Sequence, residues 1–552
     1  MKLAALSFRF KLSHTAFAAL MALYFALVVN LPFYRDTVDI IARLNNVDPG
    51  FIISLPVFLF SAFNLLFNLV CWPRIAKPLF IVMLLISSAV SYSTFNYGTL
   101  YDKGMVENIV ETDVAEAGAY ISAYSVFWLM MMGVLPSLLV ILIRLREKSG
   151  VLFFLGKKAA SIVLSGLLIW GIAALYYQDY ASFGRNNSYL RKIINPYAWI
   201  NGSIQYFGER YFLKPLPYQK LGEDAVQSKR ALVAAEKKPV LLVFVVGETA
   251  RVQNYPYFGY GRPTTPFTDP LEMIRFTDVA SCGTATAVSV RCMFSELSRQ
   301  RFDLREIKSQ DNVLDILKRA GVAILWEENN GGDKGVARHI DTILIDPWRK
   351  DEYCQKGSCY DSVLLEDFDK NVEGLSGNRI IFLHIMGSHG PTYYRRYPKS
   401  MEYFQPGCNR ADIENCTEEE IVNSYDNTIR YTDFFISQVI EKLKGLESRF
   451  HTAMIYISDH GESLGEGGAY LHGFPYDMAP LTQKRVPFMV WMSPGFVEEK
   501  RVDVSCLDDK SGLQGIYSHD DIFHSLLGVM DVETAIYRPR SDVFSSCRSG
   551  FP

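Results

Sequence analysis

The sequence lacks several features that would place it in common classes of protein. None of its nine cysteines forms a CxxC pair, which argues against a metal site built from cysteines. The formal net charge is only -3, without the basic excess typical of nucleic-acid-binding proteins. No internal repeat or low-complexity tract is evident. We therefore expect ordinary folded domains and no nucleic-acid partner.

Long apolar runs are abundant, and they lie in the first third of the 552-residue chain. The five runs are 14–33, 51–71, 78–95, 121–143 and 159–177. Each is close to the roughly 20 residues that a helix needs to cross a bilayer, so five transmembrane helices are expected. The first run resembles a secretory signal in its basic flank but lacks a small-residue cleavage site, which favours an uncleaved span.

Basic residues between these runs predict the orientation. The amino terminus and the second and fourth loops hold ten Lys and Arg residues, whereas the first and third loops hold three. Because short cytoplasmic loops collect positive charge, the amino terminus is expected in the cytoplasm. An odd number of crossings then places everything past about residue 178 on the other side.

The cysteines give an independent test of this orientation. Only Cys71 lies on the side assigned to the cytoplasm, where a thiol stays reduced. The other eight lie in the external part, as a disulfide framework requires. Neighbours in sequence suggest three pairs and leave the fourth by elimination: Cys282 with Cys292, Cys354 with Cys359, Cys408 with Cys416, and Cys506 with Cys547.

Three domains are predicted. Residues 1–177 form a transmembrane domain of five helices, and 178–238 form a helical linker rich in aromatic and basic residues that suits a membrane surface. An ordinary surface linker is the alternative. In 239–552, Val-rich apolar runs alternate with helical patterns, which predicts an α/β domain with a mixed, mostly parallel sheet sandwiched by helices. Its ligands should collect beyond the carboxyl ends of the strands.

Two of those strand ends carry potential metal ligands. The run 239–248 ends in Glu248, and the run 452–461 ends in Asp459 and His460. Oxygen and imidazole donors on a rigid edge suit a divalent ion, although a lone carboxylate at a strand end is often only a solvated cap. Between two cysteines, the stretch SCGTATAVSVRC (281–292) offers Thr284 and Thr286 as nucleophiles or as helix N-caps, and residue chemistry does not choose between them.

Several ordered motifs resemble one enzyme family. They include VVGETAR (245–251), SCGTATAVSVRCMFS (281–295), MGSHGPTYYRRYP (386–398) and YISDHGESLGEGGAYLHG (456–473). Over nearly its whole length the chain resembles the lipid A phosphoethanolamine transferases, the membrane family that includes the mobile colistin-resistance enzymes. The resemblance implies an external domain similar to the alkaline phosphatase and sulfatase superfamily.

Carried over position by position, the resemblance implies roles for named residues. Thr286 would be the nucleophile, and one zinc ion would be held by Glu248, Thr286, Asp459 and His460. Coordination to zinc would turn the threonine hydroxyl towards alkoxide. The sequence departs from the family's usual spelling at two positions, where Ala285 replaces a serine and Arg291 replaces a proline; Arg291 is a possible phosphate contact.

Further residues match positions around this centre. Those expected to contact the phosphoethanolamine group or an additional zinc are Lys334, His389 and His472. Glu462 is expected to be a ligand, a support for His460 or another hydrogen-bond acceptor behind the ligands. On a helix, Asn108, Thr112 and Glu116 would share one face, either at the substrate pocket or in contact with solvent. The remaining histidines of this domain that we assign to structure are His384, His519 and His524.

The implied reaction is a double displacement in the periplasm of a bacterium, catalysed by a multi-pass inner-membrane protein expected to be monomeric. Phosphatidylethanolamine would donate phosphoethanolamine to Thr286, and a lipid A phosphate would accept it. The added amine would weaken the attraction of cationic peptides such as polymyxins. The alternatives are a transferase to a lipopolysaccharide core sugar or another glycan, a phosphoglycerol transferase, and a catalytically silent lipid sensor.

Overall fold

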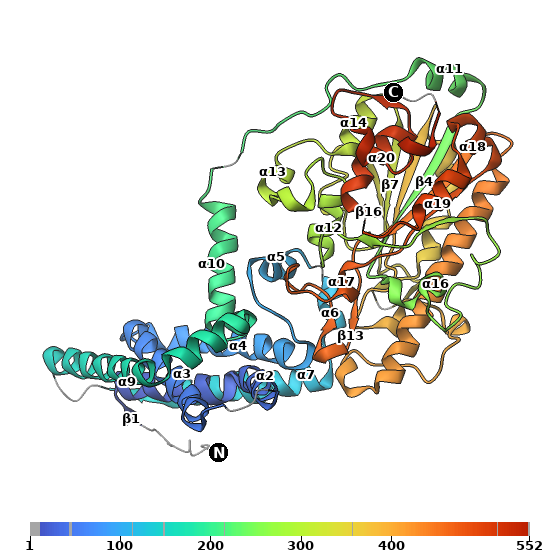
Figure 1. Ribbon diagram of the computed structural model, residues 1–552. Coiled ribbons are helices and arrows are strands. Elements are labelled where there is room, and N and C mark those ends of the chain that lie inside the picture. Colours follow the sequence, from blue (N-terminus) through green and yellow to red (C-terminus); the bar gives the residue numbers. More distant parts are fainter. Residues whose placement is uncertain are drawn as a thin grey trace, which may run out of the picture. The chain divides into compact units, whose positions relative to one another are not determined.

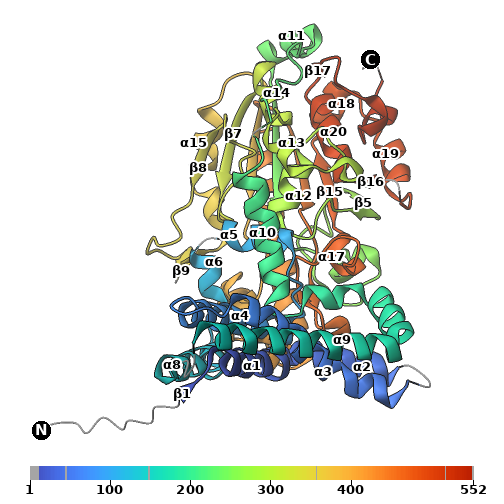
Figure 2. The same ribbon diagram turned by 90° about the vertical axis from the view of Figure 1, so that its left-hand side faces the viewer.

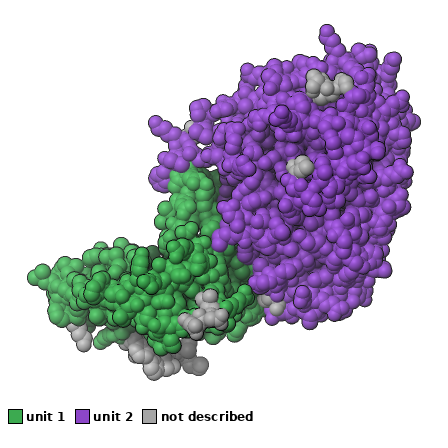
Figure 3. All heavy atoms as spheres, in the orientation of Figure 1, with its two compact units in different colours: residues 1–106, 121–210 green, residues 107–120, 211–552 purple. Residues whose placement is uncertain are grey.

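The computed structural model describes residues 11–43, 47–112, 114–146, 150–214, 216–355, 357–515 and 517–549. The side chains at 115, 116 and 414 lie outside the described part. The chain forms two compact units, one of residues 1–106 with 121–210 and the other of 107–120 with 211–552 (Figure 3). The division does not follow the order of the sequence, because a short segment of the amino-terminal half belongs to the second unit.

The first unit consists of apolar helices. Four are long and apolar enough to cross a membrane: α3 (Pro49–Val70), α4 (Ala76–Tyr97), Ala123–Leu142, which comprises α7, a π-turn and α8, and α9 (Val151–Asn186). A bent pair, His14–Val29 with α2 (Leu31–Ala42), makes a fifth if it counts as one span. The predicted number of spans is therefore confirmed as four to five by length and composition.

The first predicted span is bent rather than straight. Helix α1 (His14–Tyr24) continues as a π-turn over Phe25–Val29, and α2 leaves it at 52°. Asn30 donates from its amide to the Phe25 carbonyl at 2.8 Å, and Pro32 has no N–H with which to continue the helix ladder. Both features favour a bend at this point.

The residues between the last apolar helix and the sheet of the second unit are mostly helical. Helix α9 continues to Asn186, past the predicted end of its apolar run, and is followed by a short 3₁₀ helix, η3 (Ser188–Lys192). Helix α10 (Tyr197–Tyr211) and helix α11 (Lys229–Lys237) follow. The predicted limits of the linker, 178 and 238, thus include the end of α9 and both of these helices.

The second unit is built on a seven-stranded sheet in the order β5-β15-β12-β4-β11-β7-β8 (Figure 1). Its bounds are β5 (Ile274–Phe276), β15 (Phe488–Met492), β12 (His451–Ser458), β4 (Val240–Gly247), β11 (Arg379–His384), β7 (Ala323–Glu328) and β8 (Asp341–Leu344). The five strands from β12 to β8 are parallel neighbours, and β15 is antiparallel to both β12 and β5. The mixed, mostly parallel sheet predicted from the Val-rich apolar runs of residues 239–552 is confirmed.

Helices bury the sheet. One apolar cluster joins Leu242, Phe244 and Val246 of β4 to residues of α14 (Val313–Arg319) and α20 (Ile522–Val529). The long helix α16 (Glu418–Gly445) contacts β12, and it begins at a capping box in which Thr417 and Glu420 bond each other's backbone. All eight residues of β4 are buried, as expected for a strand covered on both faces. Figure 2 shows β8 and β7 toward one side of the sheet and β15 and β5 toward the other.

Four disulfides link the external cysteines in the pairs expected from their spacing. They join Cys282 to Cys292, Cys354 to Cys359, Cys408 to Cys416, and Cys506 to Cys547. Cys71, in the first unit, is a buried cysteine outside these disulfides, and its thiol lies 3.4 Å from the His14 carbonyl oxygen. The distribution agrees with a reducing side and an oxidising side of a membrane.

Candidate active site

The register of the sheet brings two acidic strand ends together. Gly247 of β4 pairs with Ser458 of β12, so Glu248 and Asp459 are the next residues of adjacent parallel strands. Asp459 Oδ1 accepts from the backbone N–H groups of Thr249 at 3.2 Å and His460 at 2.7 Å. These bonds hold the two strand ends against each other, and both carboxylates are fully buried.

Thr286 lies at the same edge, at the first position of helix α12 (Thr286–Met293). Its hydroxyl donates to Glu248 Oε2 at 3.0 Å and lies 3.3 Å from His460 Nε2. Thr284, in contrast, donates its hydroxyl to the Phe474 carbonyl. The structure thus separates the two threonines that residue chemistry left equivalent, because only Thr286 shares the carboxylates and the imidazole. The N-cap of α12 is Ala285, so Thr286 is not occupied with capping.

His460 is oriented as a metal ligand would be. Its Nδ1 lies 2.9 Å from the Gly461 carbonyl, which makes Nδ1 the protonated nitrogen and leaves the lone pair on Nε2. Nε2 lies 3.5 Å from Glu248 Oε1 and 3.4 Å from Asp459 Oδ2. Burial and the neighbouring His472 lower the pKa of His460 to about 3, so the imidazole is neutral at physiological pH.

These residues fit a divalent cation. Glu248, Asp459 and His460 offer ligand atoms that all lie within 4.8 Å of one another. Within the described part of the chain, Glu248 Oε1 and Asp459 Oδ2 are buried and accept no hydrogen bond. Burial, and secondly the charge of Glu248, raises the pKa of Asp459 well above its ordinary value. Two unsatisfied buried carboxylates beside a neutral imidazole are the oxygen and nitrogen donors that zinc accepts.

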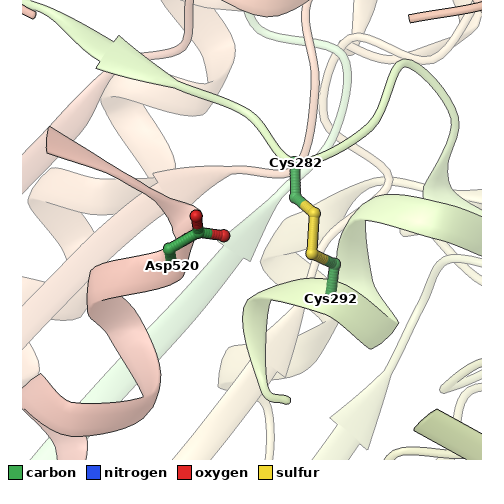
Figure 4. A group of neighbouring side chains, drawn as sticks. All are labelled: Cys282, Cys292 and Asp520. Atoms are coloured by element: carbon green, nitrogen blue, oxygen red, sulfur yellow. A yellow bond between two sulfur atoms is a disulfide. The ribbon is translucent and has the colours of Figure 1, made fainter. Parts of the chain in front are cut away.

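A second cluster of ligand types lies close by but is not equivalent. Cys282 and Cys292 lie near Asp520, and Figure 4 shows their sulfur atoms bonded to each other. A disulfide has no thiolate to offer a metal, so these two cysteines serve as a link instead. They connect the start of the loop that carries Thr286 to helix α12.

Further predicted residues lie next to His460 on the side of His472. The rings of His460 and His472 are 4.5 Å apart, and those of His472 and His389 are 5.5 Å apart. Glu462 lies 3.0 Å from His472 Nδ1 through one oxygen and accepts from Tyr393 at 3.1 Å through the other. Of the roles considered for Glu462, the structure places it behind His472 and not behind His460, which the Gly461 carbonyl orients.

The chain matches known families along both of its units. The "Phosphoethanolamine transferase EptA/EptB" model matches residues 59–211, and the "Sulfatase" model matches 241–532. Phosphoethanolamine transferase EptA of Escherichia coli strain K12 is 38% identical over 97% of both chains. Phosphatidylethanolamine transferase Mcr-1 of Escherichia coli is 34% identical, covering 95% of this chain and 96% of that one.

A solved structure extends the match to three dimensions. The integral membrane lipooligosaccharide phosphoethanolamine transferase A of Neisseria meningitidis has a TM-score of 0.92 and 36% identity, over 98% of this chain and all of that one. The chain belongs to the EptA family of phosphoethanolamine transferases. The resemblance drawn from its motifs, the fold class and the sulfatase-like character of the catalytic unit are confirmed.

One departure from the usual family motif has a clear structural role in this EptA family member. Arg291 donates to the Lys334 carbonyl at 2.8 Å, to the Ala287 carbonyl at 2.8 Å and to Glu111 at 3.0 Å. Lys308 pairs with Glu107 at 3.0 Å and with Glu111 at 3.4 Å. The guanidinium is therefore bonded to protein partners, and its contact with a phosphate stays a prediction. It fixes the loop of Lys334, whose own backbone has a positive φ of 51°.

The expected face of Asn108, Thr112 and Glu116 is interrupted. Helix α5 (Lys103–Glu111) ends before Thr112, and α6 (Val114–Ala119) is a separate helix. Thr112 donates its hydroxyl to the Asn108 carbonyl at 2.8 Å, and the side chain of Glu116 lies outside the described residues. The four-residue spacing assumed one continuous helix, whereas α5 ends at Glu111 although the Thr112 N–H also donates to the Asn108 carbonyl, at 2.9 Å. Their contact with substrate stays a prediction.

Two residues of the site were missed or given a purely structural role from sequence. Asn330, just past β7, donates to Glu248 Oε2 at 2.6 Å and lies 3.2 Å from His384 Nε2. His519 accepts from the Cys282 N–H at 3.1 Å and faces the Ser458 carbonyl at 3.0 Å. It thereby links the nucleophile loop to the end of β12. His524 lies away from these contacts and accepts from the Arg538 N–H at 3.3 Å.

Proposed function

We propose that the protein transfers phosphoethanolamine from phosphatidylethanolamine to a phosphate of lipid A through a phosphothreonine at Thr286. The observation that carries the proposal is the hydroxyl of Thr286, 3.0 Å from Glu248 and 3.3 Å from His460 at the carboxyl edge of the parallel sheet. Names of relatives support the two substrates: one is a phosphatidylethanolamine transferase, and others are Kdo(2)-lipid A phosphoethanolamine 7''-transferases.

In the first half-reaction, the Thr286 oxygen attacks phosphorus. A bond forms between this oxygen and phosphorus, and the bond from phosphorus to the diacylglycerol oxygen breaks. Glu248 accepts the hydrogen bond of the Thr286 hydroxyl and is placed to take its proton. The imidazole of His472, beside His460, or that of His389, beside His472, is proposed to protonate the departing diacylglycerol oxygen. The Lys334 ammonium is proposed to balance charge on the phosphoryl oxygens.

In the second half-reaction, an oxygen of a lipid A phosphate attacks the phosphothreonine. The new bond joins the two phosphorus atoms through that oxygen, whose proton passes to the imidazole that protonated diacylglycerol. The bond to the Thr286 oxygen breaks, and this oxygen takes back the proton held by Glu248, which regenerates the hydroxyl. The product carries an additional amine, which offsets phosphate charge and weakens binding of cationic peptides such as colistin.

Zinc is the proposed cofactor, held by Glu248, Thr286, Asp459 and His460. When bound, it would lower the pKa of the threonine hydroxyl and offset the charge of the phosphoryl group. The support for it is the pair of buried carboxylate oxygens without hydrogen bonds and the neutral, oriented imidazole. We further propose that the spans lie in the bacterial inner membrane with the second unit in the periplasm, and that the protein acts as a monomer.

The decisive test is the covalent intermediate. The purified full chain is incubated with phosphatidylethanolamine and zinc, and the peptide containing Thr286 is examined by mass spectrometry. We expect a mass increase of one phosphoethanolamine group on the wild type and none on Thr286→Ala. Thr284→Ala is the matched control, because Thr284 lies in the same loop but faces the Phe474 carbonyl, and it should retain the adduct. An equal adduct on Thr286→Ala would refute the mechanism.

A second experiment tests the acceptor. Mass profiles of lipid A from expressing cells show whether phosphoethanolamine is added to lipid A or to a core sugar instead.

A further inference from the structure

A polar cavity of about 470 Å³ lies within the first unit. It is formed by the start of α5, by η3 and by α10, and its charged and hydrogen-bonding lining residues are Asp102, Lys103, Arg191, Lys192, Tyr197 and Asn201. This volume is in the range of small-molecule sites in proteins and is larger than a free phosphate ion needs. None of the motifs around Thr286 includes these residues.

The walls of the cavity are held together by direct bonds. The Tyr101 N–H donates to the Lys192 carbonyl at 2.9 Å, and Lys192 pairs with Asp102 at 3.0 Å. Lys103 forms a salt bridge with Glu209 of α10. At Gly202, a Cβ would lie 2.9 Å from the Asp102 carbonyl oxygen, so only glycine permits this approach of α10 to α5. The cavity is therefore preformed.

The charge of the lining favours an anion. Three cations and one carboxylate line the cavity, and the two lysines are each already paired with a carboxylate. Arg191 is exposed and has no carboxylate partner among the described residues. A guanidinium presents a planar set of donors that matches a phosphate group, which makes Arg191 the available anchor.

The cavity also lies at the level expected for lipid headgroups. Residues 101–104 follow α4, and η3 follows α9, so both walls lie beyond the C-terminal ends of membrane-length helices. Tyr197 and Trp199, at the start of α10, are aromatic residues of the type that collects at membrane interfaces. A phosphate group carried by a lipid would reach this level.

We propose that this cavity binds the phosphate of a lipid headgroup and is a lipid-capture site separate from Thr286. The inference rests on the proposed function in that both proposed substrates are phosphate-bearing lipids. Arg191 holds the phosphate, while Tyr197 and Asn201 contribute hydroxyl and amide groups to the remainder of the headgroup. The site raises the local concentration of substrate without taking part in the chemistry.

The test measures binding in the absence of turnover. The full chain with Thr286→Ala, in a maltoside detergent that contains no phosphate, is titrated separately with phosphatidylethanolamine, lipid A, diacylglycerol and inorganic phosphate. Native mass spectrometry counts the bound molecules. Variants are compared in this background: Arg191→Gln, Arg191→Lys and, as a matched control, Arg185→Gln. Arg185 is an exposed basic residue in the last turn of α9 that does not line the cavity.

We expect Arg191→Gln to raise the Kd of a phosphate-bearing lipid about tenfold, and Arg191→Lys to stay within about threefold of the parent. Diacylglycerol should be unaffected, and Arg185→Gln should change little. The lipid with the larger change identifies the occupant. An unchanged Kd in Arg191→Gln, an equal loss in Arg185→Gln or Arg191→Lys, or inorganic phosphate bound as tightly as the lipids would overturn the proposal. A missing adduct on wild-type Thr286 would refute the mechanism without altering these affinities.

Discussion

The second unit contains two buried clusters of charge that contrast sharply in how their polar atoms are satisfied. In the first, Glu248, Asp459 and His460 leave two carboxylate oxygens without hydrogen bonds from the described residues. In the second, Asp531 pairs with Lys500 and with Arg548, both at 2.6 Å, and Arg548 also donates to the Lys500 carbonyl at 3.0 Å. Both clusters are buried, but only the second has a hydrogen-bonding partner for each carboxylate oxygen.

This difference distinguishes a ligand-binding site from an ion cluster that only stabilises the fold. An unpaired buried carboxylate is costly, so its persistence indicates a ligand that the protein chain itself does not supply. A buried carboxylate with two cationic partners needs no such ligand. Burial alone raises the pKa of Asp531, but Lys500 and Arg548 outweigh it and hold the pKa below its ordinary value. The following predictions test the contrast, from the largest expected effect to the smallest.

Replacing a carboxylate of the unpaired cluster should abolish function and spare the fold. Asp459→Asn removes a proposed metal ligand, and we expect transfer to fall on the order of 1,000-fold, comparable with the loss of a principal electrostatic group in other active sites. The metal-free protein should be as stable as wild type or more so, because a repelled buried charge disappears. Turnover, bound zinc and the thermal midpoint are measured together. A large drop in the midpoint of the metal-free protein would contradict the contrast.

The corresponding Asp-to-Asn substitution in the paired cluster should lower stability and spare activity. Asp531→Asn leaves Lys500 and Arg548 buried without their anion, and we expect a loss of about 3 kcal/mol in the free energy of unfolding. Activity per folded molecule should remain close to wild type, because Asp531 contacts no residue of the site in the described structure. Denaturant unfolding and turnover at saturating substrate check both parts. Stability equal to wild type would show that the ion cluster is dispensable.

His519 lies between these extremes, since it is fully paired but adjoins the site. Burial lowers its pKa to about 4, while its Nε2–H bond to the Ser458 carbonyl acts in the opposite sense. Above pH 6.5 the imidazole is neutral in both folded and unfolded chains. As the pH falls from 6.5 towards 4, only the unfolded chain gains the proton, so stability is lost, by about 2 kcal/mol at pH 5.

The comparison is with His519→Gln, which removes this titration and should flatten the loss of stability between pH 7 and pH 5. Asp521, two residues away, has its pKa raised to about 7 by burial and contributes with the opposite sign in both proteins. The difference between the two profiles therefore isolates the imidazole. Parallel profiles of the unfolding midpoint against pH would show that His519 is not held neutral.

Much of this arrangement could be predicted from sequence because it follows from strand ends. The apolar runs before Glu248 and Asp459 indicated parallel strands, and parallel strands deliver their ends to one edge. Asn330 follows β7, two strands from β4 in the sheet, so the same rule applied to the end of that strand would have found it. The partners of Arg291 had no such signal, because Glu107 and Glu111 are some 180 residues away and the helix that carries them ends at Glu111.

The disulfide between Cys282 and Cys292 gives the smallest expected effect. It encloses Thr286 in a ring closed by two cysteines ten positions apart, and the Cys282 N–H is bonded to His519, so the loop is fixed from two directions. Replacing both cysteines by serine should lower transfer about tenfold, because a misplaced nucleophile loses rate steeply. Zinc affinity should change less, since Glu248, Asp459 and His460 lie on the strand ends and outside the ring.

The matched control replaces Cys408 and Cys416, whose disulfide lies outside the loop that carries Thr286. It should leave turnover per folded molecule intact. Equal turnover in both double variants would show that the ring does not position Thr286, and an equal fall in zinc affinity and transfer would show that it supports the metal site instead.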